Sequence, residues 1–221
     1  MQRRVVLGAL GAGALSAGGA ALFGVGSMAP TPVRAQDADA TAGSALIPDM
    51  AVGAEDAPVE MIEYGSFTCP HCATFHEDVY PQLVANYIDP GLLRFVYREV
   101  YFDRPGLWAS MVARCAGPER FFGVTDILFE NQRTWTQGDP ATVAESLRAI
   151  GRSVGLSEAE LETCLTDGAF AQSLVERYEA FMEEHPIQGT PAFVIAGELH
   201  GNMSYSAMSA LIDDALAAAQ G

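Results

Sequence analysis

Short runs of apolar residues predict strands in two separate parts of the chain. Val59 to Tyr64 is an apolar run rich in β-forming residues, which is typical of a buried strand. Leu92 to Val100 alternates and is rich in aromatic and branched residues, so it predicts a second strand. Near the C-terminus, Pro191 to Ile195 and Glu198 to His200 predict two more strands joined by a turn.

Helical spacing of apolar residues fills the stretches between and after these strands. One helix is predicted from Cys69 to about Asn86, and a closing helix from Ser204 to Ala219. Residues 105–186 predict a block of five helices, one of which begins with the capping-box pair Ser157 and Glu160. This order of elements predicts an α/β core that an all-helical domain interrupts.

These patterns divide the chain into five segments. The segments are a signal peptide (1–35), a flexible leader (36–57), the first part of the core (58–104), the helical insertion (105–186) and the second part of the core (187–221). The 186 residues after the signal peptide are enough for one domain of ordinary size.

The first 35 residues have the order of parts of a secretory signal peptide. Arg3 and Arg4 form a short cationic segment, and Val5 to Val25 follows without a charge. Val33 to Ala35 then resembles a small-residue cleavage site. The paired arginines are typical of twin-arginine export, so we expect a periplasmic location; an uncleaved membrane anchor is the alternative.

The charge of the chain limits the classes of partner. Its 221 residues carry 28 acidic side chains against 12 basic ones, all of them arginine, for a formal net charge of −16. Removal of the signal peptide takes away three of these arginines and no acidic residue. Such negative charge argues against nucleic acids and anionic membranes as partners. No separate dimerisation segment is visible, so we expect a monomer.

The motif Cys69-Pro70-His71-Cys72 directly follows the first predicted strand and begins a helix. Proline suits the first helical position, because the N–H that it lacks has no partner there. Cys69 is then the N-cap, and Cys72 lies one turn later on the same face, where modest adjustment allows a disulfide. Unpaired N–H groups and the helix dipole favour the Cys69 thiolate, and His71 adds a donor or a cation.

A stabilised Cys69 thiolate favours the reduced pair and makes the Cys69–Cys72 disulfide a stronger oxidant. The motif therefore predicts thiol-disulfide exchange that leans towards disulfide donation and uses no cofactor. We do not expect a metal, because the sequence has no second Cys-x-x-Cys or paired-histidine motif to complete a zinc site. His76, His185 and His200 are expected at the surface or at helix ends.

The segment from Glu63 to Cys72 resembles the active-site region of the DsbA family of disulfide oxidoreductases. The resemblance implies a thioredoxin-like fold with an inserted all-helical domain. It also implies an acidic residue six positions before the first cysteine, where Glu63 stands and would accept or relay a proton. The alternative is a strand-end glutamate that faces solvent. The implied partners are unfolded or reduced secreted proteins and a membrane protein that re-oxidises, or reduces, the cysteine pair.

Gly189-Thr190-Pro191 resembles the loop in which thioredoxin-like proteins place a cis-proline opposite the redox pair. With Pro191 cis, the Thr190 backbone would bind an extended substrate like an added strand; a trans proline that opens an edge strand is the alternative. The best-known oxidases tend to carry valine before this proline, whereas threonine resembles isomerase relatives and other DsbA-like branches. The choice between oxidase and isomerase or reductase therefore stays open.

Cys115 and Cys164 both lie in the predicted helical block. In an oxidising compartment they would form a structural disulfide, and buried free thiols are the alternative. A non-enzymatic interpretation also stays open, in which an exported binding module carries a merely structural Cys69–Cys72 bridge. The reduction potential of the Cys69–Cys72 pair distinguishes an enzyme from such a module, since structural bridges have potentials below about −300 mV and a strong oxidant has one near about −120 mV.

Overall fold

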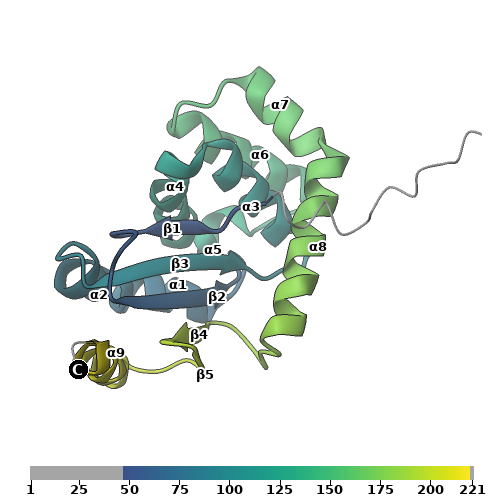
Figure 1. Ribbon diagram of the computed structural model, residues 1–221. Coiled ribbons are helices and arrows are strands. Elements are labelled where there is room, and N and C mark those ends of the chain that lie inside the picture. Colours follow the sequence, from purple (N-terminus) through teal and green to yellow (C-terminus); the bar gives the residue numbers. More distant parts are fainter. Residues whose placement is uncertain (1–46, 220–221) are drawn as a thin grey trace, which may run out of the picture. The chain divides into compact units, whose positions relative to one another are not determined.

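The computed structural model describes residues 47–219, which contain a mixed five-stranded sheet with helices on both faces (Figure 1). The strands are β1 (Met50–Val52), β2 (Val59–Gly65), β3 (Leu93–Glu99), β4 (Ala192–Ile195) and β5 (Glu198–His200). Their spatial order is β1-β3-β2-β4-β5, in which only β2 and β3 are parallel. The predicted signal peptide, with Arg3 and Arg4, and residues 36–46 of the predicted leader lie outside the described residues.

Helices follow β2, fill the gap between β3 and β4, and close the chain. They are α1 (Pro70–Asp78), α2 (Tyr80–Leu83), the π-helical turn η3 (Val84–Ile88), α3 (Arg104–Cys115), α4 (Pro118–Glu130), α5 (Gln132–Trp135), α6 (Pro140–Ser153), α7 (Glu158–Thr166), α8 (Gly168–Glu184) and α9 (Tyr205–Ala219). The block α3–α8 confirms the predicted all-helical insertion, and Ser157 and Glu160 form the predicted capping box of α7. No helix among residues 47–219 is long and apolar enough to cross a membrane.

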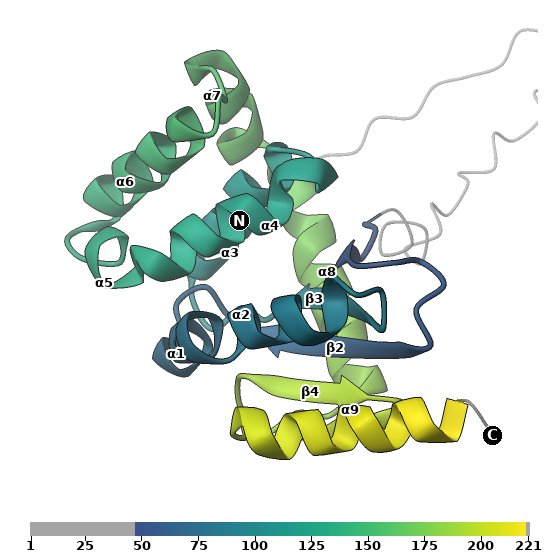
Figure 2. The same ribbon diagram turned by 90° about the vertical axis from the view of Figure 1, so that its left-hand side faces the viewer.

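Alternation along β2 divides the core between the two faces of the sheet. Ile62 and Tyr64 face α8 and pack with its Phe181. Met61 points to the opposite face, where it joins the larger core cluster that α1, α4 and α9 complete. Figure 2 shows α1, α2 and α9 on the near side of the sheet and α8 on the far side. Because side chains alternate along a strand, Glu63 shares the face of Met61 and lies beneath α1.

The single helix predicted from Cys69 to about Asn86 is wrong, because the structure divides it into α1, α2 and η3. The division falls at Val79, two residues before Pro81. Proline lacks the N–H that a continuous helix would bond to the carbonyl four residues earlier, and its ring crowds that carbonyl. The helix therefore ends at Asp78 and begins again at Tyr80.

The prediction of a flexible leader is wrong for Met50–Val52, which form the edge strand β1. Three residues give little strand signal of their own, and β1 depends on antiparallel pairing with the distant strand β3. The carboxylate of Asp49, just before β1, also binds Arg98 and Arg177. Tertiary contacts of this kind order a short segment that composition alone describes as loose.

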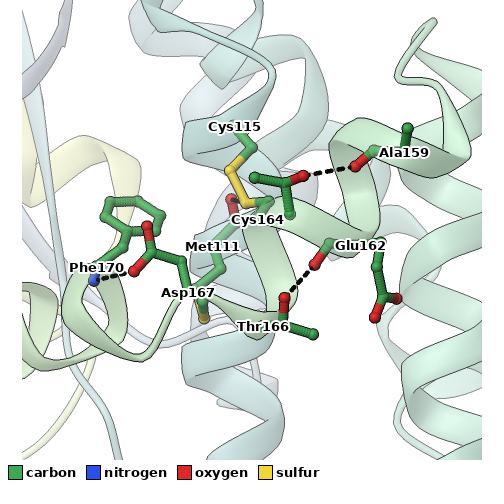
Figure 3. Close-up of a disulfide and its surroundings, with 9 residues drawn as sticks. Met111, Cys115, Ala159, Glu162, Cys164, Thr166, Asp167 and Phe170 are labelled. Atoms are coloured by element: carbon green, nitrogen blue, oxygen red, sulfur yellow. Dashed lines mark hydrogen bonds between the residues drawn. A yellow bond between two sulfur atoms is a disulfide. The ribbon is translucent and has the colours of Figure 1, made fainter.

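A disulfide joins Cys115 at the end of α3 to Cys164 in α7, with 6.4 Å between the two Cα atoms (Figure 3). Of the two alternatives for these cysteines, the structure therefore has the bridge. Cys164 is buried in a small apolar cluster with Met111 and Leu174. The bridge lies inside the helical block and closes the loop that contains α4, α5 and α6.

Candidate active site

Cys69 is the N-cap of α1 and Pro70 is its first residue, as the motif predicts. Cys69 has extended backbone angles, with φ −81° and ψ 119°, and its carbonyl accepts the N–H of Ala73 to close the first turn. Pro70 and His71 are exposed, Cys69 is half-buried and Cys72 is buried. A substrate can therefore reach the sulfur of Cys69 and not that of Cys72.

The loop before β4 lies against Cys69, although it is 121 residues away in sequence. The Thr190–Pro191 peptide bond is cis, which confirms the prediction for this bond. The thiol of Cys69 donates a hydrogen bond of 3.3 Å to the carbonyl of Thr190. The cysteine motif, Thr190 and Pro191 thus meet at one place on the molecule.

The two cysteines have opposite electrostatic environments. The pKa of Cys69 is lowered from 9.0 to about 5, chiefly by a hydrogen bond from the Cys72 thiol and then by the Thr190 side chain and the backbone N–H groups of Cys72 and His71, while partial burial opposes the change. Burial raises the pKa of Cys72, and the nearby charges of Cys69 and Glu63 raise it further. At neutral pH the reduced pair is therefore a Cys69 thiolate beside a protonated Cys72.

Glu63 is fully buried beneath α1 and is paired with His76. Glu63 Oε2 and His76 Nε2 are 2.8 Å apart, and the two side chains are 0% and 2% exposed. Burial raises the pKa of Glu63, and the contact with His76 only partly opposes this. His76 lies in the last turn of α1, as the helix-end alternative expects, but the alternative of a surface position is wrong because the side chain is buried. Its spacing of four from Cys72 places both residues on the inner face of α1.

The other two histidines are more peripheral. His185 caps the end of α8, where its Nδ1 is 2.7 Å from the Tyr64 hydroxyl, and His200 lies half-buried in β5. The position of His185 agrees with the expectation of a helix end, whereas His200 lies in a strand and is only partly exposed. Neither histidine contacts the cysteine motif through a hydrogen bond of the described residues.

Gln132 on α5 binds the active-site motif from the helical insertion and is not among the site residues predicted from the sequence. Its side-chain Nε2 donates hydrogen bonds of 2.9 Å to the carbonyls of Phe67 and Cys69. Gln132 is buried, so loss of the amide would leave these two carbonyls without the donor that the insertion provides. A buried glutamine two residues after α4 carries no periodic signal that would have indicated this contact.

A cleft of about 1230 Å³ opens beside the motif, between α1 and α2 on one side and α4 and α5 on the other. Its lining includes Pro70 and His71 at the mouth, His76 and Phe129 within, and Gln132. The sheet core and the helical insertion therefore share an open cleft next to the sulfur of Cys69.

Known proteins share the fold described above. The family model described as Thioredoxin matches residues 46–214, which is most of the chain. The chain belongs to the thioredoxin family. Within this family its architecture is that of the DsbA-type members, in which a helical domain interrupts the thioredoxin fold.

Two relatives, one known from its crystal structure and one from its sequence, are similar to this chain over most of its length. The crystal structure of alpha-DsbA1 from Wolbachia pipientis has a TM-score of 0.72 and 26% sequence identity, over 80% of this chain and 97% of that one. Disulfide bond formation protein D of Bacillus subtilis is 29% identical over 76% of this chain and 78% of its own length.

A third relative is longer than the region it shares with this thioredoxin-family chain. The protein named "Putative protein-disulfide oxidoreductase" in Rickettsia bellii is 33% identical over 169 residues. That match covers 76% of this chain and 64% of the relative. Two further Rickettsia relatives, from R. felis and R. conorii, are covered over 60% of their length.

Proposed function

We propose that this protein is an exported thiol-disulfide oxidoreductase that donates its Cys69–Cys72 disulfide to reduced secreted proteins. The observation that carries the proposal is the contrast between the two sulfurs. Cys69 is accessible and ionises with a pKa of about 5, whereas Cys72 is buried with a raised pKa. Stabilising the reduced, thiolate form makes the disulfide form a stronger oxidant.

The reaction begins when a substrate thiolate attacks Cys69 Sγ of the oxidised protein. The Cys69–Cys72 bond breaks, a new bond joins Cys69 to the substrate sulfur, and Cys72 carries the displaced electron pair. A second substrate thiolate then attacks the substrate sulfur of this mixed disulfide. The substrate leaves oxidised, and Cys69 leaves as a thiolate.

Thr190 and Pro191 are proposed to hold the substrate during this exchange. The Thr190 carbonyl lies 3.3 Å from Cys69 Sγ and therefore beside any peptide that is joined to that sulfur. An extended peptide would pair with this backbone as an added strand, which needs no particular side chain and suits substrates of varied sequence.

The pKa contrast favours oxidase activity over the isomerase or reductase alternative. The relatives' names, which refer to disulfide bond formation and protein-disulfide oxidoreduction, support the same reaction class. The arginine-led N-terminal sequence supports export to the periplasm, where a membrane partner would restore the disulfide. A non-enzymatic module with a structural bridge would not need an accessible low-pKa sulfur.

Equilibration of the protein with glutathione buffers of known ratio tests the proposal. We expect a reduction potential near about −120 mV, in the range of strong oxidants. A potential near about −180 mV would favour the isomerase alternative, and one near about −270 mV would favour a reductase. A value below about −300 mV would make the bridge structural and overturn the proposal.

A further inference from the structure

Glu63 and His76 form a buried pair that connects the region of Cys72 to the cleft between the core and the insertion. We propose that His76 is a positioning residue through which Glu63 exchanges a proton with water in the cleft whenever the Cys69–Cys72 bond opens or closes. This inference rests on the proposed oxidoreductase function and adds to it the route that the proton takes.

The geometry places His76 between Glu63 and solvent. Glu63 lies in the middle of the sheet, where Tyr97 on β3 and Phe193 on β4 are its neighbours in register. Its side chain is 0% exposed, so water does not reach the carboxyl group directly. His76 contacts Glu63 Oε2 on one side and lines the cleft on the other. A proton that leaves Glu63 for the cleft therefore meets the His76 ring first.

Each partner has a second polar atom that the protein leaves unpaired. Within residues 47–219, Glu63 Oε1 and His76 Nδ1 are buried and have no hydrogen-bond partner. A buried polar atom without a partner destabilises the fold, so two such atoms on one pair indicate a use beyond stability. In the proposed route, Oε1 exchanges a proton with Cys72, on which the charge of Glu63 acts, and Nδ1 exchanges one with a water molecule that enters from the cleft lined by His76.

The elements packed around His76 hold its ring in a fixed orientation. The ring stacks on Phe129 of α4, with centroids 4.2 Å apart and 20° between the planes. Its titratable neighbours on other elements are Glu63 on β2, Tyr80 on α2, Tyr97 on β3 and Asp126 on α4, and Cys72 lies one turn earlier on the buried face of α1. Burial raises the pKa of both tyrosines, so both stay neutral through the physiological range.

The proton follows the electrons in a balanced step. When a substrate thiolate breaks the Cys69–Cys72 bond, the electron pair remains on Cys72 Sγ, which takes a proton from Glu63. The Glu63 carboxylate takes the proton of His76 Nε2 while Nδ1 takes one from water, so the number of protons on the ring is unchanged. Re-oxidation returns the proton along the same path, and no other reactant is needed.

Two substitutions of His76 distinguish proton exchange from simple support. His76→Gln keeps an N–H donor for Glu63 and cannot titrate, whereas His76→Leu removes both properties. His185→Gln is the matched control, because His185 also contacts a buried side chain, Tyr64, and lies outside the pair. The measurement is the single-turnover reduction of the oxidised full-length protein by dithiothreitol, quenched with acid and alkylated, from pH 5 to pH 9.

We expect both His76 variants to react about tenfold more slowly than the unaltered protein at pH 7 and to lose its pH-dependent inflection, while the control keeps both. A wild-type rate and pH profile in His76→Gln would overturn the inference, since the residue would then only support Glu63. If His76→Leu does not fold, His76→Gln alone decides.

A carbon NMR titration of the Glu63 carboxyl group in the reduced protein gives a readout independent of turnover. The inference predicts that His76→Gln moves the Glu63 titration midpoint, and an unmoved midpoint contradicts it. The proposed function fails in a different way: the unaltered protein would react with dithiothreitol no faster than a small-molecule disulfide does.

Discussion

The first turn of α1 and the first turns of four insertion helices differ in what binds their free backbone N–H groups. Side chains cap α3, α6, α7 and α8 by accepting a backbone N–H from the first turn; these residues are Asp103, Asp139, Ser157 and Asp167. Cys69 stands at the same position of α1, accepts no such bond as a thiol, and has no acidic residue in the following turn.

The difference shows how an ordinary helix end becomes a reactive site. The first N–H groups of any helix lack partners within the helix and favour a negative charge. At the other four helices, a side-chain oxygen uses them permanently. At α1 the Cys72 thiol lowers the pKa of Cys69 most, and the N–H groups of Cys72 and His71 lower it further, so only the ionised sulfur is capped. The free energy of capping is thereby linked to the redox state of the cysteine pair.

The largest effect is expected when either cysteine of α1 is replaced. Cys69→Ser should abolish oxidation of reduced, unfolded protein, because a hydroxyl group neither forms a disulfide nor ionises near neutral pH. Cys72→Ser should keep the reactive sulfur and accumulate mixed disulfides with substrates, visible on non-reducing gels of the exporting cell. Oxidase activity in Cys69→Ser would contradict the proposed role.

The second cysteine pair tests whether reactivity depends on position in the helix. Cys115 ends α3 and Cys164 lies within α7, so neither sulfur faces free N–H groups of a helix start. Replacing both with alanine should cost up to about 4 kcal/mol of unfolding free energy, measured with denaturant, and leave the thiol-disulfide exchange rate intact. Loss of exchange without loss of stability would mean that this bridge takes part in the reaction.

Acidification should weaken the reduced protein in a defined window. The folded-state pKa of Cys69 is about 5 and its ordinary value is 9.0. A lowered pKa contributes stability that is fully present above pH 9 and is lost as the pH falls towards 5. The unfolding free energy of the reduced protein, minus that of the Cys69→Ser variant, should therefore decrease as the pH is lowered from 9 to 5. A difference that stays constant with pH would show that the folded protein does not favour the thiolate.

The smallest expected effect comes from a permanent cap. Ser157→Ala removes the side-chain oxygen that accepts the Glu160 N–H, and should cost about 1 kcal/mol at all pH values between 6 and 9. Thermal unfolding at several pH values measures this cost. If the stability lost in Ser157→Ala varied with pH as the Cys69 contribution does, the two kinds of helix start would not differ in this respect.

The sequence was most informative where local chemistry decides the structure. The extended N-cap at Cys69 follows from the adjacent Pro70, and the capping box of α7 follows from two side chains three residues apart. The position of Glu63 followed from its resemblance to a family motif, and strand alternation agrees with its place beneath α1. These features need no knowledge of distant parts of the chain.

Features that depend on distant partners were not accessible in the same way. β1 exists because β3 pairs with it, and Gln132 matters because α5 lies against the carbonyls of Phe67 and Cys69. Two errors did have a local signal. Pro81 indicated the end of α1, and the spacing of His76 from Cys72 indicated a buried histidine.

Titration of Cys69 in the reduced protein tests the central claim most directly. The ultraviolet absorbance of the thiolate, measured against a Cys69→Ser variant, reports the midpoint of its ionisation. The structure predicts a midpoint at about pH 5. A midpoint near the ordinary value of 9.0 would contradict the account, because the start of α1 would then do nothing for the sulfur that it holds.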